Sequence, residues 1–472
     1  MSFRIELLWS DWLVWLLVAG VIGLVWYTRR RPHLSAPWVK VGRSTSGMAA
    51  ATVLAAFVLV GLLDSIHYRT ALPPQDGKPA WSTELRSLLD RVLEPLRVNR
   101  EKTYSAPLAT HLFAKETVQM PDGGEARVYP RLRHGGAHLA DPAADWARDV
   151  AVRSLRGLSA ALLLWLVAVL AVCAAVARKT GGGIDEAWVE VWAGRRPLQW
   201  RAVLYAFGLI CLVAGPVAAL APYYHVLGTD KVGQDVLYQA LKSIRTGLVI
   251  GTLATLVTLP FALVLGVMAG YFKGWVDDVI QYLYTTLSSI PGVLLIAAAV
   301  LMMQVYVENH PELFPSTEIR ADVRLLALCV ILGITSWTGL CRLLRGEVLK
   351  LRELEYIQAA QAFGVSRWRI MMRHLTPNVM HIVMIALVMD FSGLVLAEAV
   401  LSYIGVGVDP SMTSFGTMIN GARLEMAREP MVWWSLAAAF VFMLTLVLAA
   451  NLFADAVRDA FDPRLIVSGG RA

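Results

Sequence analysis

Long blocks of apolar residues, separated by shorter polar stretches, are the main pattern along this chain of 472 residues. A helix needs roughly 20 apolar residues to cross the ~30 Å hydrocarbon core of a bilayer, and most of the blocks approach or exceed that length. The pattern therefore predicts an all-α polytopic membrane protein with about nine transmembrane helices, at residues 12–28, 48–64, 158–177, 201–221, 246–270, 279–306, 325–341, 378–402 and 431–454.

The charges of the short loops predict the orientation of these spans. The 29–47 loop contains five basic residues and no acidic one, and the 342–377 loop contains seven basic residues against three acidic ones. The 307–324 loop has the opposite balance, with four acidic residues against two arginines. Because Lys and Arg collect on the cytoplasmic side, we expect the N-terminus outside and the C-terminus in the cytoplasm. The net charge of +7 fits this distribution, so no nucleic acid partner is predicted.

A long polar segment, residues 65–156, separates the second and third apolar blocks and is predicted to lie outside. Residues 85–93 place their leucines and valine on one helical face, and residues 116–120 and 125–129 flank a 121–124 turn that favours a hairpin. These features predict a small extracytoplasmic α+β insert domain, with a helix lying flat on the bilayer surface as the alternative.

Composition agrees with a membrane protein, since 57% of the residues are hydrophobic and only 17% are charged. His134 and His138 are four residues apart, but Gly135 and Gly136 argue against the helix that a metal site of this spacing would need. No metal site is predicted. The four cysteines lie in or at the ends of apolar blocks without paired spacing, so neither a disulfide nor a zinc site is expected: Cys173, Cys211, Cys329 and Cys341.

The polar loop at residues 346–377 has the pattern of a short helix, a glycine and a second helix. Tyr356, Ala359, Ala360 and Phe363 share one helical face, and two adjacent alanines there allow another backbone to approach closely. Gly364 suits the left-handed residue that ends such a helix. Ser366 can cap a second helix, and Thr376 with Pro377 favours the N-cap and first residue of the next membrane helix.

This loop resembles the cytoplasmic coupling loop of ABC importer permeases, whose EAA-x3-G pattern sits in a groove of the ATPase subunit. Gln358 stands where the pattern has Glu, and Thr376 stands where it has Leu before the proline. Three other stretches, 227–237, 396–408 with 414–416, and 455–464, resemble the oligopeptide/dipeptide subfamily; Gln234 replaces its usual Arg. The resemblance covers roughly residues 200–465.

The resemblance implies a transmembrane permease subunit of an ATP-driven importer for peptides or peptide-like solutes in the inner (cytoplasmic) membrane. It implies alternating access, a second homologous permease, two cytoplasmic ABC ATPase subunits and an extracytoplasmic solute-binding protein. The six-helix core at 200–465, with coupling loop 346–377, would then follow two N-terminal helices (1–64), the insert (65–156), and a third extra helix with a cytoplasmic linker (157–199). Tyr356, Gln358, Ala359, Ala360, Phe363, Gly364 and Pro377 are the expected ATPase-docking residues.

No Gly-x4-Gly-Lys-Ser/Thr loop occurs in the sequence, so this chain is expected to be no enzyme and to hold no cofactor, with ATP and Mg on the partner ATPases. Asp390 and Glu398 lie in the eighth apolar block, where carboxylates are costly, and are candidates for a gate or pathway. The alternative is a membrane scaffold or sensor built on a degenerate permease core and acting through the insert. Gln358 and Gln234 favour that alternative, and the absence of a nucleophile–base pattern disfavours a membrane hydrolase.

Overall fold

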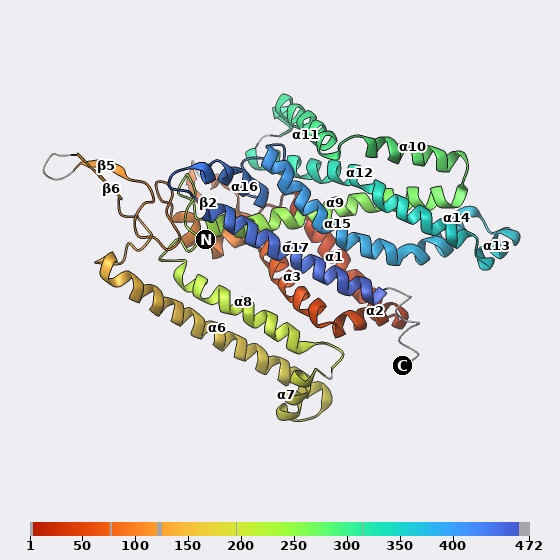
Figure 1. The fold of residues 1–472 in the computed structure, drawn as a ribbon, viewed down its shortest axis with the longest axis horizontal. Helices are drawn as coiled ribbons and strands as arrows, with labels where there is room; N and C mark the ends of the chain where they lie inside the picture. The colour runs from red at the N-terminus through yellow and green to blue at the C-terminus, as the bar shows by residue number, and fades with distance from the viewer. Residues whose placement is uncertain (1–2, 76–77, 120–124, 195, 315, 462–472) are drawn as a thin grey trace. The chain divides into compact units, whose positions relative to one another are not determined.

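The computed structural model describes residues 3–75, 78–119, 125–194, 196–314 and 316–461. Among these residues, nine helices are long and apolar enough to cross a membrane (Figure 1). The predicted all-α polytopic architecture is confirmed. The spans are α1 (Trp9–Arg29), α3 (Thr45–Asp64), α6 (Pro142–Thr180), α8 (Trp200–Leu220), α9 (Val236–Phe272), α11 (Gly292–Asn309), α12 (Thr317–Arg352), the continuous stretch Arg367–Ile404, and α17 (Trp434–Phe461).

The sixth predicted span, 279–306, was wrong as a single helix. The chain forms α10 (Trp275–Ser289) and then α11, with an extended Ile290 and a non-helical Pro291 between them. The apolar run continues through the break, so the pattern of hydrophobic residues could not reveal it. Pro291 has no N–H to donate, and this favours a helix that starts again after it.

Several spanning helices extend far beyond their apolar blocks. The helices α6, α9 and α12 contain 39, 37 and 36 residues, because polar residues continue the helix on one or both sides of the apolar part. Asp141 caps the start of α6 by accepting a hydrogen bond from the N–H of Ala143. The expected boundary between the insert and the third extra helix, at 156/157, therefore falls inside α6.

The chain forms two compact units. The first contains residues 1–7, 38–246 and 413–449, and the second contains 8–37, 247–412 and 450–472.

The helical elements not yet named are α2 (Pro32–Arg43), α4 (Leu88–Val92), α5 (Glu94–Val98), α7 (Ile184–Ala193), α13 (Glu355–Ala362), α14 (Arg367–Ile370), α15 (Thr376–Ile404), α16 (Phe415–Arg423), the 3-10 turns η1 (Pro311–Leu313) and η3 (Glu425–Ala427), and the π-helical turn η2 (Met371–Leu375).

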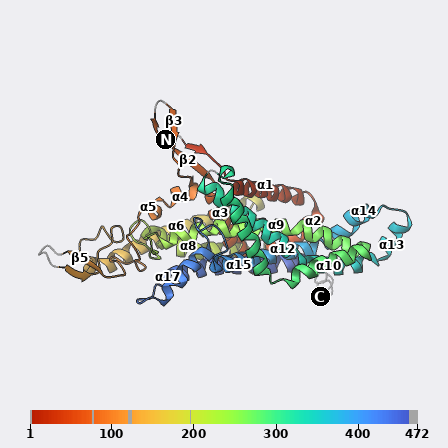
Figure 2. The same ribbon diagram turned by 90° about the horizontal axis from the view of Figure 1, so that it is seen from above.

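The first unit contains the strands found among the described residues. Strand β2 (His67–Gln75) pairs antiparallel with β1 (Phe3–Ile5), β3 (Lys78–Trp81) and β4 (Arg86–Ser87), and Figure 2 shows β2 and β3 near the N-terminus. A separate hairpin joins β5 (Glu116–Gln119) to β6 (Glu125–Val128), as predicted, although its 121–124 turn lies outside the described residues. The predicted helix at 85–93 is shorter in the structure: α4 begins at Leu88, after Ser87 as its cap, and ends at Val92. A second short helix, α5, follows it.

The helices α6 and α8 lie side by side in the first unit, and α7 packs at one end of the pair (Figure 1). Two glycines allow this close approach: a Cβ on Gly157 would lie 2.4 Å from the carbonyl oxygen of Gly215. The buried residues Val169, Cys173 and Leu204 pack between these helices, with Ala187 and Val191 of α7 beside them. The third extra helix, α6, is therefore a packed element of this unit.

The second unit has two apolar clusters. One lies among α9, α11, α12 and α15 and includes Leu325, Leu332 and Leu401. The other joins the ends of α9 and α12 to α10, α13, η2 and the start of α15, and includes Tyr284, Leu344, Ile357 and Leu375. The second cluster gives the 346–377 loop a packed base.

Candidate functional site

The loop helix α13 ends as the sequence predicts. Gly364 has a φ of +71°, its N–H bonds to the carbonyl of Gln361, and the N–H of Val365 bonds to the carbonyl of Ala360. This pair of bonds is a Schellman cap, which fixes the direction in which the chain leaves the helix. Val365 and Ala360 also pack on the apolar cluster below.

The outward face of α13 is apolar and exposed. Phe363 is 88% exposed and Tyr356 is 45% exposed, whereas Ile357 is fully buried on the opposite side. Ala359 is exposed, but Ala360 is half-buried and belongs partly to the base. After the glycine, Trp368 adds another side chain that is 62% exposed. Aromatic side chains at this exposure are typical of a surface that binds a partner.

The second half of the loop differs from the prediction. A helix runs from Arg367 to Ile404 without a break, and it contains a π-helical turn over Met371–Leu375. Thr376 is helical, so it is not an N-cap, and Pro377 lies inside the continuous stretch. Ser366 stands at the N-cap of α14, but its side chain makes no capping bond. The π turn changes the backbone bonding next to Pro377, which allows the helix to continue past a residue without an N–H.

Polar contacts attach α13 to its base. The Nδ2 of Asn378 donates to the hydroxyl of Tyr356 at 2.9 Å, which links α13 to α15. The Nε2 of Gln358 donates to the carbonyl of Glu353 at 3.1 Å, at the end of α12. A glutamate in place of Gln358 would have no N–H to donate to this carbonyl when ionised. The amide therefore has a structural use at this position.

The two acidic candidates in α15 have different surroundings. Glu398 is 1% exposed and accepts a hydrogen bond of 2.6 Å from the hydroxyl of Ser402. Asp390 is half-buried near the middle of the helix and makes no hydrogen bond or ion pair with another described residue. A carboxylate at that depth needs water or a partner outside this chain.

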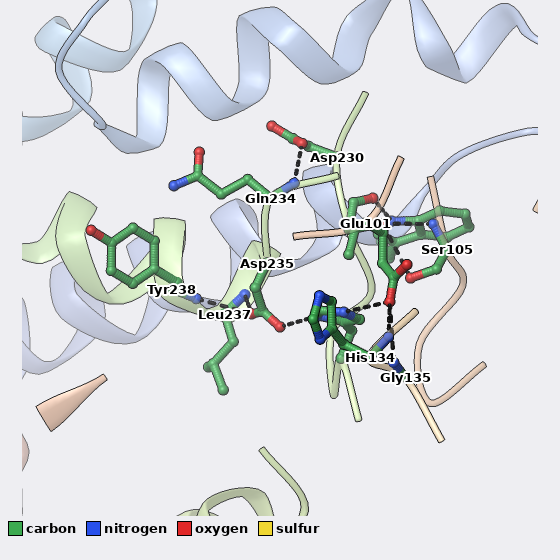
Figure 3. A network of polar contacts seen from close by, with 12 residues as sticks. Glu101, Ser105, His134, Gly135, Asp230, Gln234, Asp235, Leu237 and Tyr238 are labelled. Atoms are coloured by element: carbon green, nitrogen blue, oxygen red, sulfur yellow. Dashed lines mark hydrogen bonds and ion pairs between the residues drawn. The ribbon is translucent and has the colours of Figure 1, made fainter. Parts of the chain in front are cut away.

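A second group of polar residues, which sequence reasoning missed in part, lies in the first unit (Figure 3). His225 Nδ1 lies 2.8 Å from Asp235 Oδ2, and its Nε2 lies 3.5 Å from Glu101 Oε1. All three side chains are buried. We call Glu101, His225 and Asp235 the outer triad.

Backbone groups hold the carboxylate of Glu101 in place. It accepts hydrogen bonds from the N–H groups of Arg133, His134 and Gly135, at distances between 2.8 and 3.1 Å. The N–H of Glu101 in turn donates to the carbonyl of Gly233. Figure 3 shows Glu101 beside His134 and Gly135, with Asp235 of the 230–238 segment nearby. The insert is thus bound to the residues that precede α9.

The neighbouring carboxylates and the imidazole of the triad stabilise each other's charged forms. Burial would lower the pKa of His225, but hydrogen bonding to Asp235 and Glu101 raises it to about 9. Burial would raise the pKa of Glu101, but bonds from His225 and from the three backbone N–H groups lower it to about 2. The triad therefore holds a protonated histidine between carboxylates at neutral pH.

The 227–237 stretch folds into a tight loop that contributes Asp235 to the triad. Asp230 Oδ1 accepts bonds from the N–H groups of Val232 and Gln234, and its Oδ2 accepts one from Nε2 of Gln239 at 2.7 Å. Asp235 Oδ1 accepts the N–H of Leu237 at the start of α9. The sequence signature marked Asp230 and Asp235, but Glu101 and His225 stand in no recognisable pattern.

The histidines of the insert do not gather around a metal position. The backbone N–H of His134 donates to Glu101, whereas Nε2 of His138 lies 2.7 Å from Asp149 Oδ2. Among the described residues, no group of three or more His, Cys, Asp or Glu is placed to hold a metal ion.

Comparison with known proteins places this arrangement in a family. Residues 262–467 match the model of the binding-protein-dependent transport system inner membrane component. The glutathione transport system permease protein GsiD of Pectobacterium atrosepticum is 31% identical over 299 residues, which cover 59% of this chain and 91% of that protein. The chain belongs to the family of binding-protein-dependent transport system inner membrane components. It is a multi-pass inner membrane protein and a permease component.

Two other permeases of the family are also similar. The oligopeptide transport system permease protein OppC of Mycobacterium tuberculosis is 34% identical over 239 residues, covering 51% of this chain and 76% of that protein. The dipeptide transport system permease protein DppC of Lactococcus lactis subsp. cremoris is 29% identical over 240 residues, covering 51% of this chain and 64% of that protein. In this permease component, the family match contains the 346–377 loop and Asp390, whereas the outer triad lies before it.

Proposed function

We propose that this permease component imports peptides or peptide-like solutes by alternating access, driven by separate ATPase subunits that dock on α13. ATP and Mg would bind those partner subunits. The named permeases for glutathione, oligopeptides and dipeptides support this solute class. A second homologous permease would complete the pathway, and an extracytoplasmic binding protein would deliver the solute.

The single observation that carries this proposal is the exposed aromatic face of α13 on a fixed base. Phe363 is 88% exposed although it directly precedes the capped glycine, so its position is defined by backbone bonds and not by packing. A groove on a partner could receive this side chain without rearranging the loop, which keeps the entropy cost of docking small. Movement of the partner would then move α13 and its base together.

The charges of the loops support an orientation with the N-terminus outside and the C-terminus in the cytoplasm. In that orientation, α13 faces the compartment that contains ATP, and the outer triad faces the compartment of the binding protein. Asp390, which has no partner among the described residues, would line the pathway or meet the second permease. Glu398 would act nearer the outer gate.

Replacement of Phe363 by alanine in the assembled complex tests the docking proposal. Because the side chain makes little contact within the chain, its loss should change the stability of the permease by less than about 0.5 kcal/mol. We expect substrate-stimulated ATP hydrolysis to fall about tenfold or more, as for an anchoring aromatic residue. Trp275→Ala is the matched control, since Trp275 is 77% exposed on a different helix. Unchanged hydrolysis in Phe363→Ala would favour a scaffold or sensor role instead.

A further inference from the structure

The amphipathic helix α10 is fixed to α12 along one face. Ile280 and Tyr284 are buried in the cluster that also contains Leu340 and Leu344 of α12. At the start of α10, Asp277 accepts two hydrogen bonds from Arg345: Nε to Oδ1 at 2.6 Å and Nη2 to Oδ2 at 2.7 Å. A bidentate arginine–carboxylate pair fixes orientation as well as distance, because two parallel bonds resist rotation.

The same part of α12 carries the coupling loop. Arg345 lies two turns before the end of α12, and α13 begins at Glu355, three residues after that end. Ile357 of α13 is buried in the cluster that holds Tyr284 of α10. An exposed ion pair, Lys273 Nζ to Glu353 Oε1 at 3.0 Å, crosses the same region. α10 and α13 are therefore attached to one segment of α12.

The other end of α10 is the helix break. Ser288 lies beside α12. Its Oγ accepts a hydrogen bond of 3.1 Å from Nη2 of Arg342 and lies 3.5 Å from Oγ1 of Thr338. Ile290 and Pro291 then leave helical geometry, and Ile290 is 42% exposed. Thr338 lies within the apolar part of α12, so the break lies at membrane depth. Irregular backbone at that depth is tolerated where it is covered by protein or lines a water-filled path.

These contacts form a continuous route from the loop to the break. We propose that the Asp277–Arg345 pair is a coupling joint: it makes α10 follow α13, so that movement of the docked loop reaches the break at Ile290 and Pro291. Asp277 and Arg345 are positioning residues, since the contacts on which the proposal rests are those they make with each other within the chain. This inference rests on the proposed function and adds the route by which the loop would act.

Asp277→Asn tests the joint in the assembled complex reconstituted in vesicles. The variant keeps the shape of the side chain but loses the charge and one acceptor oxygen. We expect substrate-stimulated ATP hydrolysis to stay within about twofold of wild type while the solute transported per ATP falls about tenfold, within the range for residues that carry coupling. Arg345→Lys, which keeps the charge but loses the bidentate geometry, should give a smaller loss of the same kind.

Two controls make the result specific. Glu353→Gln breaks the neighbouring exposed ion pair and should leave transport per ATP unchanged. The exchanged double variant Asp277→Arg with Arg345→Asp should recover part of the transport lost in Asp277→Asn. Equal loss of hydrolysis and transport in Asp277→Asn, or no loss of either, would overturn the joint. Failure of the docking proposal can be told apart from failure of the joint, because only the former predicts unchanged ATP hydrolysis in Phe363→Ala.

Discussion

The α13 loop and the outer triad are built in opposite ways. The loop directs Phe363 away from its own chain, and the backbone cap at Gly364 sets the position of this residue. The triad buries three ionisable side chains, and its two carboxylates take up backbone N–H groups and the imidazole. An exposed apolar face can be buried by a partner and so stabilise a complex, whereas a buried polar network stabilises the fold of its own chain.

This difference assigns different duties to the two regions. In our proposal, the loop receives another protein and transmits its movement. The triad is buried within the chain, and it fastens the insert to the start of α9. The insert is therefore part of the permease fold, so its removal would leave His225 and Asp235 without Glu101 and without the surrounding backbone. We expect variants of the triad to affect stability and variants of the loop to affect coupling.

The largest expected effect comes from Glu101→Ala. The substitution leaves the protonated His225 with only one neighbouring carboxylate of the triad, that of Asp235. It also removes the acceptor of three backbone N–H groups. Removing one partner of a buried pair costs about 3–5 kcal/mol. Thermal unfolding of the purified permease should shift to clearly lower temperature. Glu116→Ala, which breaks the ion pair with exposed Lys102, should cost about 1 kcal/mol or less. Equal shifts in both variants would contradict a closed network.

A smaller effect is expected from Gly364→Ala. Open space surrounds the position, so the cost comes from the left-handed backbone and is about 1–2 kcal/mol. Because the cap directs Phe363, we expect weaker substrate-stimulated ATP hydrolysis with a normal amount of permease in the membrane. Gly20→Ala is the control, since Gly20 also stands in open space but within the helix α1. If the two variants hydrolyse ATP alike, the cap does not matter for coupling.

Titration of the triad should also make the stability of the permease depend on pH. The pKa of His225 is raised from 6.5 to about 9, so the protonated imidazole stabilises the fold fully below pH 6.5, and this contribution disappears as pH rises through about 9. Glu101, with its pKa lowered from 4.5 to about 2, contributes above pH 4.5 and loses its contribution as pH falls toward 2. The stability difference between wild type and His225→Gln, followed by thermal unfolding, should shrink between pH 6.5 and 9. A constant difference would show that the triad does not hold a charged histidine.

The sequence predicted the parts of the fold that follow local patterns. Apolar blocks determine where spans form, and Gly364 marks the loop cap because few other residues adopt its backbone conformation. The break at Pro291 and the helix continuing through Pro377 were not predictable in this way, because membrane helices tolerate proline when other groups satisfy the backbone. The outer triad forms because folding brings Glu101 next to His225. No spacing rule predicts a contact between positions so distant along the chain.

Site-specific photo-crosslinking most directly tests the claim that α13 receives the motor subunit. A benzophenone amino acid placed at Phe363 in the assembled complex should form an adduct with the ATPase subunit, and the yield should change when ATP is trapped. The same probe at Trp275 should form no such adduct, because that side chain, although also exposed, lies on α10 and not on the proposed docking face of α13. An ATPase adduct from position 363 alone is the predicted result. No adduct at 363, or equal adducts from both positions, would contradict the account.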